Sequence, residues 1–478
     1  MWNRIEEILK GFRKEFSHKA AYGWLIVLVI GLMIRTDKLG VTSVVRDLAL
    51  RPECYESMMR FFRAGSWSLS ALQAAWLGIV ARHAPLWRYQ GRVVLIGDGT
   101  KQSKEGRKKP GVKRLRQESE TQSKASYIYG HFWGCVGILI GTAEKLACLP
   151  LHSRLHDGLR ETADWEGAEE TGASHVARLV SEACFCAAAF GSAFLLLDRL
   201  YPSVEALLIL NACNAVHSGR VDMISRMKRN AIAWTEVPER RPGQSGRSRK
   251  KGEKVRLWEL FEGKRAEFQK ETLKINGKDR VMEYLSEDLL WGKGLYQKLR
   301  FVLVREGESR FILVSTDLSL SATDIIFLYL SRFCVERAFR ELKQQTGAFS
   351  YHFWSKSMPL LNRFRKKADP LPLESVTSPK DRGRILKTVR ATELYALISS
   401  IAMGILQILS IEFDTPELRA QLRYQRTPAG ARISEANLMS YLRRRIFVFM
   451  AFQPENSITQ IIRSVQKPAE SEKTSNAA

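Results

Sequence analysis

The fold is best approached from Tyr329-Leu-Ser-Arg332-Phe-Cys-Val-Glu336-Arg-Ala-Phe-Arg-Glu-Leu-Lys343. At about 100° per residue, a helix would bring the four numbered side chains into a sector of roughly 60°. A carboxylate flanked by two cations and a phenol suits a divalent metal ion and a phosphodiester, because the acid can bind the metal and the other groups can bind phosphate oxygens. The alternative is an amphipathic helix with a solvated charged face, and this pattern alone favours neither.

The sequence also marks the two ends of this helix. Ser321-Ala-Thr-Asp324 is a capping box, with Asp where Glu or Gln is more usual. Gly347 is expected to end the helix. One continuous helix is therefore predicted between them, with apolar surface to bury on Ile325, Ile326, Leu328, Phe333 and Phe339.

Two more acids follow short apolar runs that are typical of buried strands. Arg92-Val-Val-Leu-Ile-Gly-Asp98 and Phe194-Leu-Leu-Leu-Asp198 both stop at an aspartate. A strand that ends in a carboxylate places it at a sheet edge, where a substrate can reach it. Two such acids and a helical glutamate can hold two Mg²⁺ or Mn²⁺ ions about 4 Å apart. Taken singly, Asp98 would be a turn residue before Gly99, and Asp198 a helix N-cap.

Together these motifs resemble a DDE transposase of a bacterial insertion sequence. The closest resemblance is to the cut-and-paste group, which has a tyrosine–arginine–glutamate–lysine signature and a β-rich insertion before the last acid. Tyr329, Arg332, Glu336 and Lys343 meet the signature spacing in full. The resemblance runs from about residue 90 to about residue 360 and includes Gly97-Asp98-Gly99-Thr100-Lys101, Tyr129-Gly130-His131-Phe132-Trp133-Gly134, Arg226-Met-Lys228 and Tyr351-His352-Phe353-Trp354.

The resemblance implies a ribonuclease-H-like α/β core whose metal-binding and catalytic triad is Asp98, Asp198 and Glu336. Two Mg²⁺ (or Mn²⁺) ions and double-stranded DNA, as element ends and as target, are the expected cofactors and partner. Cutting at the element ends would free a 3′-hydroxyl that attacks target DNA. The open alternatives are a metal nuclease without joining activity and a domesticated DNA-binding protein whose acids are unused. The residues expected to contact DNA are Tyr329, Arg332, Lys343, Lys101, Lys104, Arg226, Lys228, Arg340 and Trp291.

The composition agrees with a polyanionic partner. The chain has 75 Lys and Arg against 50 Asp and Glu, a formal charge of +25 and a pI near 9.9, so binding to DNA should depend strongly on salt. Proteins that bind RNA are equally basic, and charge does not distinguish the two. Seven cysteines without metal-like spacing fit a reducing cytosol. The expected location is the bacterial cytoplasm, on the nucleoid.

The apolar run from Trp24 to Ile34 predicts a buried helix, because it is too short to span a bilayer. No membrane partner is expected. Residues 1–88 as a whole are predicted to be a helical region that binds DNA ends. Within it, Val41–Leu50 and Pro52–Arg63 are short helices whose junction at Arg51-Pro52 is either the turn of a helix-turn-helix or part of a plain helical cap.

The first part of the core is predicted over residues 89–231. Its strands are expected near Val93–Ile96, Trp133–Ile140 and Phe194–Leu197, with a helix over Ala173–Ala189. The segment between Asp98 and Gly111 is interpreted as a basic loop that either follows a DNA backbone or is simply solvated. Its cations are Lys101, Lys104, Arg107, Lys108 and Lys109.

The 138 positions from Asp198 to Glu336 exceed what a compact core needs, so residues 232–315 are predicted to be a β-rich insertion. Its strand candidates are Val255–Phe261, Glu271–Ile275, Arg280–Leu285, Leu299–Arg305 and Phe311–Val314. A mobile basic loop is expected from Arg240 to Lys251. Residues 316–370 complete the core with the final catalytic helix. Residues 371–478 form a helical C-terminal region, with long helices over Ile385–Leu409 and Leu438–Phe452 and a disordered tail from Glu470. A homodimer on paired DNA ends is expected.

Trp291 is placed at a turn of the insertion. By the resemblance, an aromatic residue there can receive a flipped base near the cut. Trp234 and Trp258 compete for this role, and the structural alternative is a tryptophan that covers the sheet. His131 and His352 are assigned to packing and not to catalysis.

Overall fold

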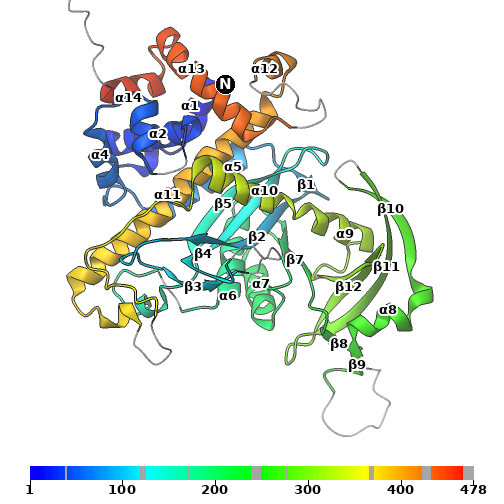
Figure 1. Cartoon of the computed structure of the whole chain (residues 1–478). Coiled ribbons are helices and arrows are strands. Elements are labelled where there is room, and N and C mark those ends of the chain that lie inside the picture. Colours follow the sequence, from blue (N-terminus) through cyan, green and yellow to red (C-terminus); the bar gives the residue numbers. More distant parts are fainter. Residues whose placement is uncertain are drawn as a thin grey trace, which may run out of the picture.

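The computed structural model describes residues 1–37, 40–117, 125–169, 172–237, 249–275, 278–364, 371–422 and 432–466 (Figure 1). The tail from Glu470 and most of the loop from Arg240 to Lys251 lie outside these residues. The described chain is a mixed α/β protein built on one 13-stranded sheet. Its strands are β1 Arg88–Tyr89, β2 Arg92–Ser103, β3 Lys113–Arg116, β4 Tyr127–Ile140, β5 Ala147–Leu155, β6 Ala193–Leu197, β7 Val221–Arg226, β8 Ile232–Trp234, β9 Lys254–Arg256, β10 Gln269–Ile275, β11 Lys278–Trp291, β12 Gln297–Glu306 and β13 Ser309–Ser315.

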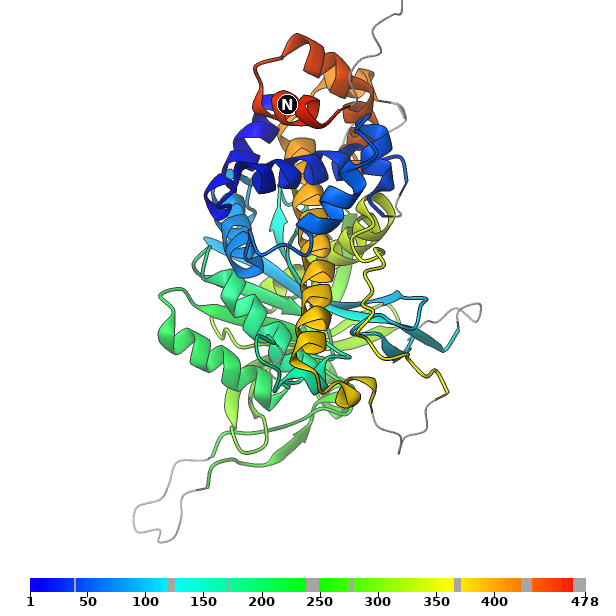
Figure 2. The ribbon, with the colours of Figure 1, turned by 90° about the vertical axis from the view of Figure 1, so that its left-hand side faces the viewer.

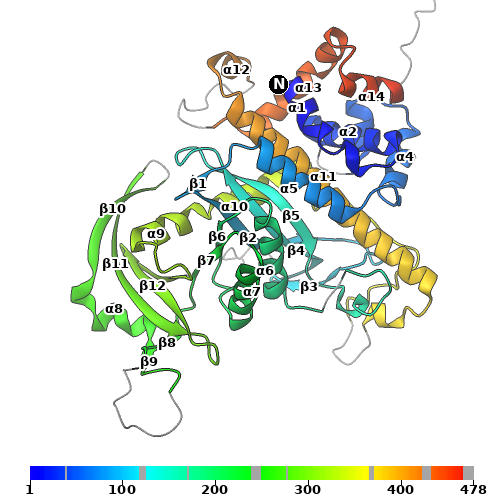
Figure 3. The ribbon, with the colours of Figure 1, turned by 180° about the vertical axis from the view of Figure 1, so that it is seen from behind.

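Helices cover both faces of this sheet and gather at one end of the molecule (Figures 1 and 3). They are α1 Trp2–Lys10, α2 Lys19–Ile34, α3 Thr42–Asp47, α4 Cys54–Phe61, α5 Leu69–His83, α6 His175–Ala187, α7 Val204–Val216, α8 Leu260–Gly263, α9 Ala322–Ser331, α10 Cys334–Glu341, α11 Pro379–Glu412, α12 Pro416–Ala420, α13 Glu435–Phe452 and α14 Ser457–Val465.

The sheet is parallel only at its centre. β2, β6 and β7 run parallel, and the other pairings between the described strands are antiparallel. The main strand order is β3-β4-β2-β6-β7-β13-β12-β11-β8-β9. The strands after residue 232 therefore extend the central sheet through the pairing of β13 with β7.

Alternation along the central strands divides their apolar side chains between two cores, as the period of two in a strand requires. The core shared with α6 and α7 contains Val93, Leu95, Leu195 and Leu197. The core shared with α9 contains Val94, Ile96, Phe194 and Leu196. Both faces of β2 and β6 are thus buried, which explains why their sequences are continuous apolar runs.

The helices from the two ends of the chain form one layer. α2 packs against α11, α13 and α14, and Figure 2 shows α11 running from the sheet into this group of terminal helices. α11 is long and apolar enough to cross a membrane by length and composition, but 94% of its apolar window is buried inside the protein. That burial is typical of a core helix.

The prediction of one continuous helix from Ser321 to Gly347 is wrong. The Ser321–Asp324 capping box and the left-handed Gly347 stop are both present, but α9 ends at Ser331 and α10 begins at Cys334. α9 packs on β7 and β10–β13, whereas α10 packs on β2 and β5. The two intervening residues, Arg332 and Phe333, keep helical backbone angles but separate the two helices. Phe333 is 56% exposed, although it was expected to be buried.

Three other local predictions are also wrong. β2 does not stop at Asp98 but continues to Ser103, because β4 pairs with it over the whole distance. Val255–Phe261 is not a strand: β9 ends at Arg256, and short helical turns follow. Trp291 is not in a turn, since it is the last residue of β11 and pairs with Gln297.

Candidate active site

The three predicted acids lie on β2, just after β6, and on α10. The parallel register pairs Ile96 with Leu196, and each acid lies two residues beyond this pair, Asp98 within β2 and Asp198 just after the end of β6. β6 ends at Leu197, and Ser225 of β7 donates hydrogen bonds to the carbonyls of Leu197 and Asp198, which fixes the chain as it leaves the sheet. Asp198 does not cap the next helix, because Ser203 is the N-cap of α7.

Arg332 contacts all three acids. It sits in the turn between α9 and α10, and its side chain is only 9% exposed. One guanidinium nitrogen, Nη1, lies 3.1 Å from Asp98 Oδ2. The other, Nη2, lies 4.0 Å from Asp198 Oδ1 and 3.8 Å from Glu336 Oε1. The signature arginine therefore lies in the space between the three acids.

The pKa of the Asp98 carboxyl is shifted by its surroundings. Burial raises its pKa to about 6, against the opposing effects of Arg332 and of the Gly99 amide, which donates a 2.7 Å hydrogen bond to Oδ1. The charges of Asp198 and Glu336 raise it further. A buried carboxyl with a raised pKa, next to two other acids, is typical of a functional site.

The donor set fits a hard divalent cation in its chemistry, since three carboxylates surround one positive charge. Within the described residues, however, no three metal-ligating side chains are grouped closely enough to hold an ion. The positive charge between the acids is instead the Arg332 guanidinium. Asp98, Asp198 and Glu336 are the carboxylates available to a metal ion, and Arg332 occupies the space between them in this structure.

A cleft of about 740 Å³ opens beside Asp98 and Asp198. The structure places the predicted DNA contacts Lys101, Arg226 and Lys228 in its wall. Trp258, which was named from the sequence as a competitor of Trp291, also lines the cleft. The other cationic and aromatic lining residues were not assigned to DNA from the sequence; these are Phe132, Arg199, Tyr201, Arg229, Arg310 and Phe311.

The remaining signature residues lie close to the acids without lining this cleft. Tyr329 is buried under Arg332, and burial raises the pKa of its hydroxyl. Lys343 Nζ donates hydrogen bonds of 2.7 Å to Thr100 Oγ1 and 2.9 Å to the carbonyl of Lys101. Glu336 and Arg340 are exposed on α10, where substrate can reach both.

Two predicted DNA contacts are placed elsewhere. Lys104 is 1% exposed, and its Nζ donates a 2.7 Å hydrogen bond to the carbonyl of Tyr351. Burial lowers its pKa to about 7, so it is neither accessible nor firmly charged. Trp291 packs against the main core and does not line the cleft. Trp258 lines the cleft, and the Arg229 guanidinium lies 4.6 Å from its ring centroid.

Comparison with protein-family models matches residues 11–277 to the family described as DDE superfamily endonuclease. This segment is more than half of the chain and contains Asp98 and Asp198, and it ends before Glu336. Comparisons with curated proteins and with solved structures gave no match.

Proposed function

The chain belongs to the DDE superfamily endonucleases, and on this premise we propose that it is a DNA transposase that cuts at the ends of an insertion sequence and joins them to target DNA. The observation that carries the proposal is the convergence of Asp98, Asp198 and Glu336 on Arg332, at the edge of a cleft with cationic walls. The proposed core is ribonuclease-H-like, because parallel β2 and β6 present two acids at the same level, facing a third on a helix.

The proposed mechanism assigns distinct work to the residues of this chain. Lys101, Arg226 and Lys228 hold backbone phosphates and fix the position of the strand to be cut. Arg332 leaves the acids and pairs with a DNA phosphate, which exchanges one anionic partner for another. The released carboxylates can then hold Mg²⁺ or Mn²⁺, which supplies charge stabilisation for in-line phosphoryl transfer.

Trp258 is the better candidate for stacking with an unpaired base near the cut. Both tryptophans pack against the main core, but Trp258 also lines the cleft beside Asp98 and Asp198, whereas Trp291 does not. Stacking on an indole ring offsets part of the cost of unstacking a base, which is a few kcal/mol.

The proposal is tested by Mg²⁺-dependent cleavage of DNA that carries the ends of the element, with wild type beside Glu336→Ala. The expected result is cutting at the ends by wild type alone, with both proteins bound to the DNA. Equal binding without cutting by either protein would contradict nuclease activity and favour a domesticated DNA-binding protein.

A strand-transfer assay then separates a transposase from a nuclease that does not join. Pre-cut ends with a free 3′-hydroxyl and a supercoiled target plasmid should give joined products with wild type. Cutting without joined products would assign the second activity instead.

A further inference from the structure

A second cationic surface of the described chain lies on an arm of the sheet, outside the acid cleft. The arm consists of β3, residues 127–130 at the start of β4, the loop 104–112 and residues 353–364. Figure 2 shows β3 and the ends of β2 and β4, in blue and cyan, projecting from the body of the molecule. Backbone hydrogen bonds from Ser355 to Lys108 and from Leu361 to Arg107 hold residues 353–364 beside the loop.

The exposed face of the arm alternates arginines with tyrosines. The register of β3 and β4 places Arg114 opposite Tyr129 and Arg116 opposite Tyr127. Side chains directly opposite each other lie on one face of a sheet, and Leu115, which belongs to the other face, is buried. The Arg114 guanidinium lies 4.1 Å from the ring centroid of Tyr127, which is 49% exposed. Each arginine on this face therefore has an aromatic ring beside it.

Residues 353–364 add the same kinds of side chain. The Arg363 guanidinium lies 5.3 Å from the ring centroid of Tyr129, whose hydroxyl donates a hydrogen bond to the Arg363 carbonyl. Phe364 is 93% exposed and, with Arg107, lines a hollow of about 440 Å³. Glu105 is the acid in the wall of this hollow. Cations and aromatic rings thus lie side by side on both parts of the arm.

The arginines of the arm are not neutralised by acids of the described residues. The ion pair found on the arm joins Lys113 to Asp157, at 2.6 Å. Within the part of the chain that the structure describes, no acid lies within ion-pair distance of Arg107, Arg114, Arg116 or Arg363. Such arginines suit a polyanion, because their contacts with phosphates release counterions.

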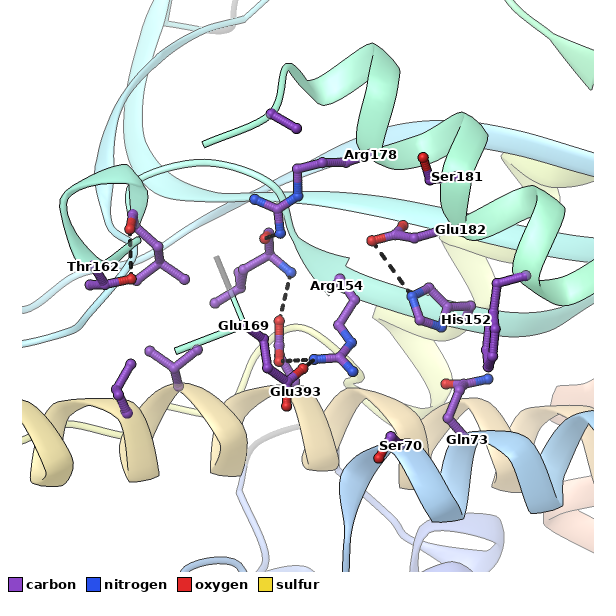
Figure 4. A pocket seen from close by; sticks show the side chains of 16 residues that line it. Ser70, Gln73, His152, Arg154, Thr162, Glu169, Arg178, Ser181, Glu182 and Glu393 are labelled. Carbon is purple, nitrogen blue, oxygen red and sulfur yellow. Dashed lines mark hydrogen bonds and ion pairs between the residues drawn. The ribbon is translucent and has the colours of Figure 1, made fainter. Parts of the chain in front are cut away.

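Arg154, in a cavity of about 460 Å³ between β5, α6 and α11, is by contrast paired with acids. Figure 4 shows its guanidinium next to Glu169 and Glu393, and its Nη1 lies 2.9 Å from Glu393 Oε2. The same nitrogen also bonds to Glu169. A polyanion is therefore expected on the arm and not in this cavity, whose acids would repel it.

The arm lies on the same side of the sheet as the first acid. Alternation along β4 places Tyr127 on the same side as Cys135, which pairs with Asp98. At about 3.3 Å per residue, Tyr127 lies roughly 26 Å along β4 from Cys135. Between these positions Phe349 packs on Trp133, so the arm and the acid site are separate surfaces.

We propose that the arm binds single-stranded DNA, with Arg114, Arg116 and Arg363 on the phosphates and the Tyr127 and Phe364 rings stacked on bases. Sites for single strands combine a cationic surface with aromatic rings in this way. Duplex DNA would use the arginines but not the rings, because its bases are already stacked on one another. The source of the strand rests on the proposed function, since opening of the duplex at the cut supplies an unpaired strand.

The first test measures DNA binding by the full-length protein without metal, so that no cutting is needed. Fluorescence anisotropy compares an oligothymidine of about 12 nucleotides, a usual size for a single-strand site, with a blunt duplex of the same length. Combining Tyr127→Ala with Phe364→Ala should weaken single-strand binding at least about tenfold, because two stacking rings are lost, and should leave duplex binding nearly unchanged. Unchanged single-strand affinity, or equal losses for both DNAs, would overturn the proposal. Tighter binding of the matching RNA by wild type would overturn the choice of DNA.

Phe452→Ala is the matched control, since Phe452 is 80% exposed on α13, outside the arm. It should leave both affinities unchanged. Because the three substituted rings are exposed, thermal unfolding should give the wild-type Tm for each variant. A loss of single-strand affinity equal to that of the arm variant would count against the arm.

The second test concerns the arginines. Combining Arg114→Gln with Arg116→Gln should flatten the slope of log affinity against log salt for the oligothymidine by about 1.4, at about 0.7 for each phosphate contact on a single strand. An unchanged slope would exclude contacts between these arginines and the strand.

The third test locates the strand without any substitution. Ultraviolet cross-linking of an oligonucleotide that contains bromodeoxyuridine, followed by mass spectrometry, should place adducts on Tyr127 or Phe364. Adducts confined to cleft residues such as Trp258 would overturn the proposal.

These outcomes are distinguishable from failure of the proposed function. Loss of single-strand binding by the arm variants, in a protein that cuts no DNA, would support the arm and reject the transposase. Cleavage by wild type, together with full single-strand binding by the arm variants, would reject the arm alone.

Discussion

At the scale of single residues, Arg332 and Lys104 show how far the meaning of a charge depends on burial. Both are cations in or near the predicted site, and sequence reasoning assigned both to DNA. Arg332 lies among three carboxylates, whereas Lys104 lies under Tyr351 with no acid to pair with its ammonium among its described hydrogen bonds and ion pairs. The spacing of the signature predicted that Arg332 lies on the same side as Glu336. No local pattern separates Lys104 from the accessible Lys101, because burial there results from the packing of a distant segment.

The position of Arg332 predicts competition between its guanidinium and a divalent cation. Arg332→Ala should bind Mn²⁺ about tenfold more tightly than wild type in the absence of DNA, which corresponds to about 1.4 kcal/mol. The reason is that the acids lose a positive neighbour that a metal must otherwise displace. Mn²⁺ titration followed by electron paramagnetic resonance at pH 8 measures this, because the Asp98 carboxyl of the wild type is ionised well above its pKa of about 6, to which the Arg332 charge contributes a lowering effect. Arg226→Ala is the control, and equal affinities for all three proteins would contradict the idea.

Lys104 predicts a pH-dependent stability. Its pKa is about 7 in the folded protein against 10.5 as the ordinary value. Between these pH values the unfolded chain binds a proton that the folded chain does not, so stability rises with pH through this window. Below pH 7 the buried Lys104 is protonated, and the full cost of that buried charge lowers the free energy of unfolding. Its upper limit is about 5 kcal/mol at 1.36 kcal/mol per pKa unit.

Lys104→Met should remove that cost and lose one hydrogen bond to Tyr351, which offsets about 1–3 kcal/mol of the gain. The variant should therefore unfold at higher denaturant concentration than wild type at pH 6, with an advantage that shrinks toward pH 10. Lys108→Met, at a nearby lysine that is only partly buried, should change little at either pH. A constant difference from pH 6 to pH 10 would argue against a depressed pKa.

At the scale of elements, the sequence predicted what depends on local chemistry. The runs that became β2, β4 and β6, the helix α6, and the cap of α9 were all foreseen, because apolar period and capping residues act over a few positions. The break between α9 and α10 was not foreseen, because it depends on the two different surfaces on which these helices pack. Val255–Phe261 has strand-like composition, yet it forms a turn that carries Trp258 into the cleft.

The position of Trp258 in the cleft predicts that its loss slows cleavage of DNA. Trp258→Ala should slow a step after the first nick by about tenfold, since stacking on an aromatic is worth about 1–3 kcal/mol per base. Quenched-flow analysis of nicked and fully cut DNA would separate the steps. Trp291→Ala is the matched control and should lower thermal stability without a specific effect on the later step. The reverse outcome would return the assignment to Trp291.

At the scale of the whole molecule, the +25 charge and the acid site have separate effects on DNA affinity and on DNA cleavage. Cationic side chains of the cleft contribute to DNA affinity through counterion release, while the three acids lower that affinity slightly and take part in the proposed cleavage.

Asp98→Ala, Asp198→Ala and Glu336→Ala should therefore keep DNA binding, with a slope of log affinity against log salt like that of wild type. Arg226→Ala combined with Lys228→Ala should flatten that slope by about two, one for each lost phosphate contact. Fluorescence anisotropy over a range of salt concentrations measures both. Lost binding in all three acid variants would mean that these carboxylates maintain the fold, whose central strands and α10 they join through Arg332.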